Sequence, residues 1–187
     1  KDEFIIKFIY YSAPVIVVIF IIGICYKALK IFREKRSLHI RNYIGVLYVV
    51  LVCVIGPGLV VHTLLKDQFG RPRPREVVEF GGDMKFLPPL HISNQCQANC
   101  SFPSGHAAAG YMLVSLAYLS KPNRRLKVKA IALVVGLTMG LTRVIQGAHF
   151  LSDILFSGVI VFLVAEILAK LILRHHSRKA EIIFRAD

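Results

Sequence analysis

The sequence has 187 residues, of which 55% are hydrophobic and 19% are charged, and its mean hydropathy is +0.59. The apolar residues form long unbroken runs, without the stripes of amphipathic helices or the alternation of half-buried strands, and this argues against a water-soluble domain. The net charge of +13 would suggest nucleic acid in a soluble protein, but here the basic residues lie between the apolar runs. We therefore predict an all-α, polytopic membrane protein that forms one domain over residues 1–187 and has no nucleic-acid partner.

Five apolar segments predict transmembrane helices. They run from about Phe4 to Ile31, Ile44 to Leu65, His106 to Leu119, Val128 to Ile145 and Phe150 to Leu173. Because a helix rises about 1.5 Å per residue, about 20 residues are needed to cross a hydrocarbon core of ~30 Å. The third segment is shorter than this, so we expect it to begin below the membrane surface. Within the second segment, the sequence Gly56-Pro57-Gly58 predicts a kink.

The basic residues predict how these helices are oriented. They fall into three groups: Lys30, Arg33, Lys35, Arg36 and Arg41; Lys121, Arg124, Arg125, Lys127 and Lys129; Arg174, Arg178, Lys179 and Arg185. All three groups share one membrane face if the five segments alternate in direction, and the positive-inside rule makes that face cytoplasmic. The long connector over residues 66–105 then lies on the outer face.

Two of the four cysteines, Cys96 and Cys100, lie in this outer connector, whereas Cys25 and Cys53 fall within apolar segments. An oxidising compartment favours a disulfide between Cys96 and Cys100 over two free thiols. A zinc site is a weaker alternative, because only His91 lies nearby and no second pair of closely spaced cysteines exists. We predict no metal.

Three polar clusters interrupt the apolar chain, and the predicted topology brings all three to the outer face. They are KDQFGRPRPRE, with Lys66, Arg71, Arg73 and Arg75; PSGH, with Ser104, Gly105 and His106; and TRVIQGAHFLSD, with Arg143, His149 and Asp153. Each cluster alone has an ordinary structural reading, such as a snorkelling arginine, a helix cap or a turn. Their convergence at one membrane depth predicts a single site.

The residue types in these clusters match a phosphoryl group. Arginine forks fit phosphate oxygens, and lysine supplies a point charge. A helix that starts at Ser104 and Gly105 would present backbone N–H groups to an anion. A phosphate monoester carries a charge of about −1.5 to −2 at neutral pH, which the cationic side chains would neutralise.

The two histidines suggest a covalent mechanism. His149 and Asp153 are four residues apart and share one face of a helix, so the carboxylate can fix the imidazole tautomer and leave the other nitrogen free to attack phosphorus. His106, from another helix, can act as general acid for the leaving oxygen. His62 lies one turn before Lys66 and can either support the site or pack between helices. Glu166 and Lys170 can form an i, i+4 ion pair.

The three clusters resemble the signature of the type 2 phosphatidic acid phosphatase superfamily, K-x6-RP, PSGH and SR-x5-H-x3-D. The one departure is Thr142 in place of serine, which keeps a hydroxyl group. The resemblance implies that His149 forms a phosphohistidine, that Asp153 orients it and that His106 is the acid. It also implies that no cofactor is needed and that phosphate is bound by Lys66, Arg73, Ser104, Gly105 and Arg143.

The resemblance leaves Arg71 and Arg75 outside the motif, with secondary roles. Membrane members of the superfamily are similar in having six helices, with the first motif after the third. Here that motif follows the second segment, and the chain begins without methionine. We therefore expect a further helix to precede this sequence in the full chain.

The substrate implied is a lipid, because the site lies at the depth of lipid head groups. The stretches GRPRPREVVEFGG and CSFPSGHAAAG are similar to bacterial lipid A phosphatases and to their relatives that act on phosphatidylglycerophosphate or undecaprenyl pyrophosphate. We expect an enzyme of the bacterial inner membrane whose active site faces the periplasm. A lipid-to-lipid phosphotransferase and a non-catalytic phospholipid binder or transporter are the alternatives.

Overall fold

The computed structural model describes residues 39–66 and 68–174, together with Val15, residues 18–20, residues 22–24, Tyr26 and Lys30. The predicted first helix therefore lies largely outside the described residues, as do Cys25 and most of the first and third basic groups. The described part contains helices, loops and one isolated bridge between Val77 and Met84, with no strand. The prediction of an all-α membrane bundle is confirmed.

The helices follow the predicted apolar segments closely. In chain order they are α2 (His39–Cys53), the π-helix η1 (Val54–Leu65), α3 (Gly105–Tyr111), the short 3₁₀ turn η4 (Met112–Val114), α4 (Ser115–Leu119), α5 (Pro122–Ile145), α6 (Leu151–Leu168) and the π-helix η5 (Ala169–Arg174). Among the described residues, three helical stretches are long and apolar enough to cross a membrane: Tyr43–Leu65, Pro122–Ile145 and Leu151–Leu173.

The start of α5 and the form of the predicted kink differ from the prediction. Helix α5 begins at Pro122 and not at Val128, because proline is well suited to the first helical turn and the basic residues that follow it continue the helix into the connector. The expected kink at Pro57 appears as a change of helix type. The α-helical pattern ends at Cys53, and Pro57, which has no N–H to donate, lies inside η1.

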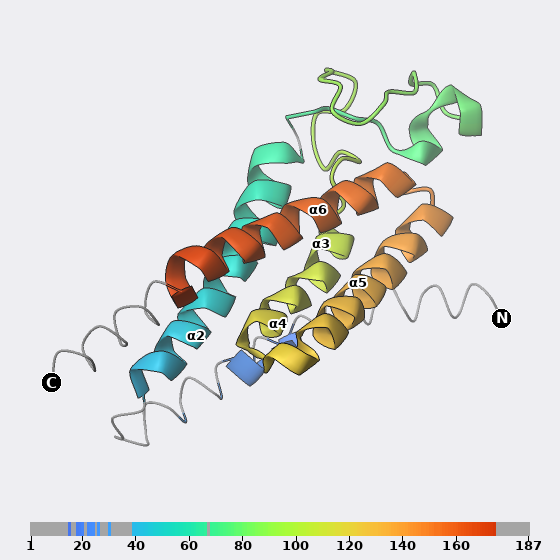
Figure 1. Ribbon diagram of the computed structural model, residues 1–187. Coiled ribbons are helices and arrows are strands. Elements are labelled where there is room, and N and C mark those ends of the chain that lie inside the picture. The colour runs from blue at the N-terminus through green and yellow to red at the C-terminus, as the bar shows by residue number, and fades with distance from the viewer. Residues whose placement is uncertain are drawn as a thin grey trace, which may run out of the picture.

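The short helices α3 and α4 lie end to end inside the bundle, between α5 and the pair α2 and α6 (Figure 1). Glycines allow this close packing. A Cβ atom on Gly110 of α3 would lie 2.7 Å from the Cα of Gly136 in α5, and one on Gly136 would lie 2.1 Å from the ring of Tyr111. The fifteen residues of Gly105–Leu119 are too short to span a membrane, so close packing holds α3 and α4 within the bundle.

We call the end of the bundle where η1 and α5 finish and α3 and α6 begin the site end. The connector over residues 66–104 extends beyond this end (Figure 1) and carries two 3₁₀ turns, η2 (Pro74–Glu76) and η3 (Val78–Phe80). The predicted disulfide between Cys96 and Cys100 is present, with 5.7 Å between the two Cα atoms. The backbone N–H of Arg75 donates to Gly147 O at 3.1 Å, which ties the connector to the turn between α5 and α6.

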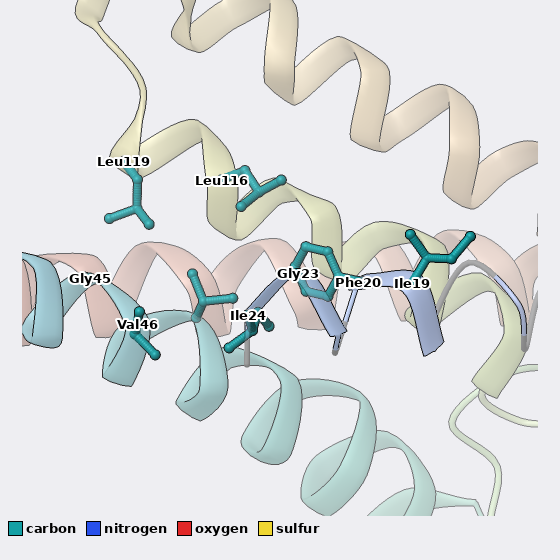
Figure 2. Close-up of a pocket in the computed structure, with 9 residues that line it drawn as sticks. Ile19, Phe20, Gly23, Ile24, Gly45, Val46, Leu116 and Leu119 are labelled. Carbon is teal, nitrogen blue, oxygen red and sulfur yellow. The ribbon is translucent and has the colours of Figure 1, made fainter. Parts of the chain in front are cut away.

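An apolar cavity of about 310 Å³ lies away from the site end, between α2, α4 and the described residues of the preceding segment (Figure 2). Its lining is Ile19, Phe20, Gly23, Ile24, Gly45, Val46, Val49, Leu116 and Leu119. None of these nine described residues has a titratable or hydroxyl side chain, so they offer no group for acid–base or nucleophilic chemistry.

Candidate active site

The fold brings the three polar clusters together at the site end. Lys66 ends η1, Ser104 to His106 start α3, Arg143 lies in the last turn of α5, and Asp153 lies in the first turn of α6. The imidazole of His106 interacts electrostatically with Arg143, His149, Lys66 and Arg73. Side chains more than 80 residues apart in the sequence therefore surround one position, as the predicted topology requires.

His149 is held in one tautomer by a backbone carbonyl. Its side chain is almost wholly buried, its Nδ1 atom lies 2.6 Å from Ser101 O, and Asp153 Oδ2 is more distant at 3.6 Å. Because a carbonyl oxygen can only accept a hydrogen bond, Nδ1 must carry the proton. The lone pair of neutral His149 is therefore on Nε2. The sequence predicted orientation by Asp153 and missed Ser101, which is the closer partner.

Asp153 is fully buried and its carboxylate is surrounded by donors. Oδ2 accepts hydrogen bonds from the Phe150 N–H at 2.8 Å and from the Ser101 hydroxyl at 2.5 Å, and Oδ1 accepts one from the guanidinium of Arg71. The bond from Phe150 fixes the first turn of α6, since Asp153 caps the helix on which it lies. Ser101 contacts both His149 and Asp153 and joins them into one network.

Arg71 is the ion-pair partner of Asp153, although the motif gave it only a secondary role. Only 1% of Arg71 is exposed. In addition to Asp153, its Nη1 donates to Ser152 Oγ at 2.9 Å and its Nε donates to Leu87 O at 2.8 Å. The guanidinium lies 4.2 Å from the ring centroid of Phe150, within the range of a cation–π contact.

Arg73 and Lys66 are buried cations on the connector at the site end, each 7% exposed. The Nε and Nη2 atoms of Arg73 donate to Asn99 O at 3.1 and 2.6 Å, and its backbone N–H donates to Glu76 Oε2 at 2.8 Å. Asn99 lies inside the loop closed by the Cys96–Cys100 disulfide. The disulfide therefore fixes the acceptor that orients the guanidinium of Arg73.

The start of α3 has one open position beside a buried one. Ser104 is wholly buried, its N–H donates to Ser157 Oγ at 2.9 Å, and its hydroxyl accepts from the Ala107 N–H at 3.4 Å, so it caps the helix. A Cβ atom on Gly105, by contrast, would meet no atom within 4 Å. The structure thus leaves space for a ligand beside Gly105, while the polar groups of Ser104 serve the fold.

The remaining predicted residues lie at the margin of the site. Arg143 is partly buried, and its Nη1 donates to Gln146 Oε1. The hydroxyl of Thr142, which replaces the serine of the motif, donates to Met139 O at 2.8 Å within α5. Arg75 has an exposed side chain and contributes its backbone to the connector. His62 is exposed on η1. It therefore neither makes a buried contact with the site nor packs between helices.

Burial and neighbouring cations favour neutral imidazoles. The pKa of His149, in the turn before α6, is lowered mainly by burial and further by Lys66, and its contacts with Asp153 oppose this only in part. His106 lies outside the three long spans, and burial together with Arg143, His149, Lys66 and Arg73 lowers its pKa to about 4. At neutral pH the two histidines are therefore uncharged, and they lie beside the cations Lys66, Arg73 and Arg143.

These motifs and this geometry agree with the comparison to known proteins. The profile of the PAP2 superfamily matches residues 43–177. The chain belongs to the PAP2 superfamily. It is 41% identical over 151 residues to the lipid A 4'-phosphatase of Francisella tularensis subsp. novicida, which covers 80% of this chain and 64% of that protein.

Two proteins of Rhizobium etli are also similar. Its lipid A 4'-phosphatase is 35% identical over 155 residues, which cover 81% of this chain and 57% of that protein, and its lipid A 1-phosphatase is 33% identical over 150 residues, which cover 78% and 59%. The chain thus spans about three fifths of the length of these relatives. No solved structure matches this chain.

Proposed function

We propose that this chain is an integral membrane lipid phosphatase that removes a phosphate group from a bacterial envelope lipid through a phosphohistidine on His149, without a metal ion. The observation that carries the proposal is the fixed tautomer of His149, with Nδ1 bound to Ser101 O at 2.6 Å, in a site that also holds His106 and buried cations. A neutral imidazole with Nε2 free is the form of histidine that can attack phosphorus.

In the first step, His149 Nε2 attacks the phosphorus atom and the bond between phosphorus and the lipid oxygen breaks. The electron pair of that bond leaves with the lipid oxygen, which takes a proton from His106. Because His106 is neutral in the free protein, it first receives this proton from the monoprotonated phosphate group of the bound substrate. Lys66, Arg73 and Arg143 stabilise the charge on the phosphoryl oxygens in the transition state. The backbone at Gly105, which has open space beside it, lets an anion approach α3 closely.

In the second step, a water molecule attacks the phosphohistidine and the bond between phosphorus and Nε2 breaks. His106, now neutral, takes a proton from this water, and the electron pair returns to Nε2. Inorganic phosphate leaves with the proton that the substrate brought, and both histidines are neutral again. His106 acts as an acid in the first step and as a base in the second. One residue can serve both steps if it lies close to the leaving lipid oxygen and to the attacking water.

The substrate we favour is lipid A bearing a phosphate group. The support is the similarity to proteins named lipid A 4'-phosphatase and lipid A 1-phosphatase, of which the first shares 41% identity with this chain. A protein named phosphatidylglycerophosphatase B from Bacillus subtilis is 31% identical over 124 residues, so phosphatidylglycerophosphate is the next candidate. Undecaprenyl pyrophosphate is the third.

We place the site at the periplasmic face of the inner membrane. Two features support this orientation. The Cys96–Cys100 disulfide lies at the site end, and disulfides form in oxidising compartments such as the periplasm. The basic residues of the connector before and in the first turns of α5, from Lys121 to Lys129, lie at the opposite end, where the positive-inside rule expects the cytoplasm.

The test is hydrolysis of a defined panel by the purified full chain in detergent micelles. The panel holds lipid A with phosphates at both positions, phosphatidylglycerophosphate and undecaprenyl pyrophosphate. Mass spectrometry reports which phosphate is lost. We expect His149→Ala to reduce the rate by about 10⁴-fold or more, as for the loss of other nucleophiles. Arg124→Gln, an exposed arginine at the opposite end, is the matched control and should keep full activity.

The same assay separates the alternatives. Phosphate transferred to an added acceptor lipid, in place of free phosphate, would identify a phosphotransferase. Lipid binding by the wild-type protein with no hydrolysis would support the non-catalytic binder, and unchanged lipid turnover in His149→Ala would contradict the proposal. Activity lost on addition of a chelator and restored by a divalent ion would contradict a metal-free mechanism.

A further inference from the structure

Arg71 joins the outer connector to the first turn of α6. Its guanidinium pairs with Asp153, donates to Ser152 Oγ at 2.9 Å and Leu87 O at 2.8 Å, and lies 4.2 Å from the ring centroid of Phe150. With 1% exposure, this side chain is buried more completely than Lys66 and Arg73, which are each 7% exposed, and its guanidinium is held by protein groups on several sides. Arg71 therefore differs from the cations that would bind substrate.

Arg71 is linked to the Nδ1 side of His149 by two routes. Its side chain holds Asp153, whose Oδ2 lies 3.6 Å from His149 Nδ1. Its backbone carbonyl accepts the Ser101 N–H at 2.8 Å, and the carbonyl of Ser101 is in turn the 2.6 Å partner of Nδ1. The Ser101 hydroxyl closes the network by donating to Asp153 at 2.5 Å. Both groups that orient His149 thus depend on Arg71.

The charge of Arg71 has a chemical consequence. A carboxylate buried beside an imidazole attracts a proton to that imidazole, and a protonated His149 cannot attack phosphorus. The positive charge of Arg71 offsets the charge of Asp153, so the pair exerts less attraction on a proton than Asp153 would alone. A neutral His149 is therefore favoured while Asp153 keeps its orienting contact.

The other charged groups near His149 come from the remaining elements of the site. Lys66 at the end of η1 and His106 of α3 interact with it, and Arg73 and Arg143 surround His106. Lys66 also favours a neutral His149. However, a bound phosphate would neutralise Lys66, since that lysine belongs to the phosphate-binding set. Arg71, held within the protein, keeps its effect when the substrate is bound.

We propose that Arg71 is a positioning residue that keeps His149 neutral and nucleophilic in the substrate complex by holding Asp153 and Ser101. The proposal rests on the function proposed above, in which His149 is the nucleophile. It assigns a role to a residue that the superfamily motif leaves out.

The test compares Arg71→Gln, which removes the charge but keeps a donor for Asp153, with Arg71→Lys, which keeps the charge. Arg124→Gln is the control for loss of one exposed arginine. The pKa of His149 is measured by NMR in the full chain with ¹³C-labelled histidine rings, and the resonance is assigned by its absence in His149→Gln. We expect Arg71→Gln to raise the pKa of His149 by about one unit or more, and Arg71→Lys by less than half of that.

The acid limb of kcat/KM for lipid phosphate hydrolysis should move by the same amounts. A merely structural role would lower kcat/KM equally at every pH and leave the limb in place. Equal pKa values of His149 in wild type, Arg71→Gln and Arg71→Lys would overturn the inference. The NMR titration needs no turnover, so it tests Arg71 even where the proposed function fails, and that failure would appear separately as no hydrolysis by the wild-type protein.

A second variant covers the case in which Arg71→Gln does not fold. Arg71→Gln combined with Asp153→Asn removes both buried charges, and such paired replacements are tolerated better than single ones. With neither charge present, the pKa of His149 should stay within about half a unit of the wild-type value. A rise of a full unit in the double variant would contradict the compensation between Arg71 and Asp153.

Discussion

Helix α6 carries one carboxylate near each end, and the two differ in nearly every physical respect. Asp153, at the site end, pairs with Arg71, and their side chains are 0% and 2% exposed. Glu166, at the opposite end, pairs with Lys170 at 3.2 Å, and their side chains are 34% and 55% exposed. A buried ion pair is kept only where its surroundings compensate for the lost hydration, whereas an exposed pair contributes little to stability. The comparison indicates that the site end of α6, where the ion pair is buried, is the end specialised for function.

Removing the charge of Asp153 should have the largest effect on stability. Asp153→Asn leaves the guanidinium of Arg71 buried without its counter-charge, so we expect the free energy of unfolding to fall by about 3–5 kcal/mol. Denaturant unfolding in detergent micelles, followed by circular dichroism, measures this loss. A loss below about 1 kcal/mol would mean that the two ends of α6 are energetically alike.

The pH dependence of catalysis sharpens the contrast between the two ends of α6, because the histidines whose protonation should control the rate lie at the site end. His149 must be neutral, and since its pKa is lowered by burial, the acid limb of kcat/KM should lie below the ordinary histidine value of about 6.5. His106 has a pKa of about 4 and is unprotonated at neutral pH, so the proton for the leaving oxygen must enter with the substrate. A phosphate monoester loses its second proton near pH ~6, and kcat/KM should fall tenfold per unit above that.

The limbs of kcat should behave differently. A bound phosphate offsets the charge of Lys66, Arg73 and Arg143, which raises the pKa of His106 in the complex. The alkaline limb of kcat should therefore lie at higher pH than that of kcat/KM. The pH profiles of kcat and kcat/KM are both obtained from steady-state rates between pH 4 and pH 9. This range of about five units covers the titration of His106 and His149. Coincident alkaline limbs, or a kcat/KM limb well above pH 7, would argue against this assignment of the proton.

Breaking the Cys96–Cys100 disulfide should have a smaller effect, confined to the site end. Asn99, whose carbonyl orients Arg73, lies in the closed loop. Closure of so short a loop contributes about 2 kcal/mol in the chain-entropy account. We expect Cys96→Ser with Cys100→Ser to raise KM by less than about tenfold, since phosphate binding weakens by at most about 1.4 kcal/mol, and to leave kcat little changed. Reductant should reproduce the effect in the wild type and do nothing to the double variant.

The sequence predicted the site end well where function depends on side-chain type and spacing. His106, His149 and Asp153 were predicted to lie close together because alternating helices must return to the same face, and the structure brings them together, while their catalytic roles stay a prediction. The disulfide was predicted from its compartment. Long apolar runs identified the spans, although α5 begins earlier than its apolar stretch because a basic first turn is also compatible with helix.

What the sequence did not predict depends on the path of the backbone. The contact of His149 with the Ser101 carbonyl involves no side chain of Ser101, so no residue type signals it. The burial of Arg71 follows from its packing against Phe86 and Phe150, which are brought there by the fold of the connector. An arginine between a glycine and a proline carries no sign of a carboxylate 82 positions later.

The opposite end provides the smallest predicted effect and the control for the others. Glu166 accepts a hydrogen bond from Tyr118 and pairs with Lys170, and the ring of Tyr118 has Lys129 4.8 Å from its centroid. Because the pair is partly exposed, Glu166→Gln should change the free energy of unfolding by no more than about 1 kcal/mol. Its amide can still accept the Tyr118 bond, and His149, the proposed nucleophile, lies just before the other end of α6. Unfolding and lipid hydrolysis measured beside Asp153→Asn test this. If Glu166→Gln lost activity as severely as Asp153→Asn, the specialised role would have to extend along the whole of α6.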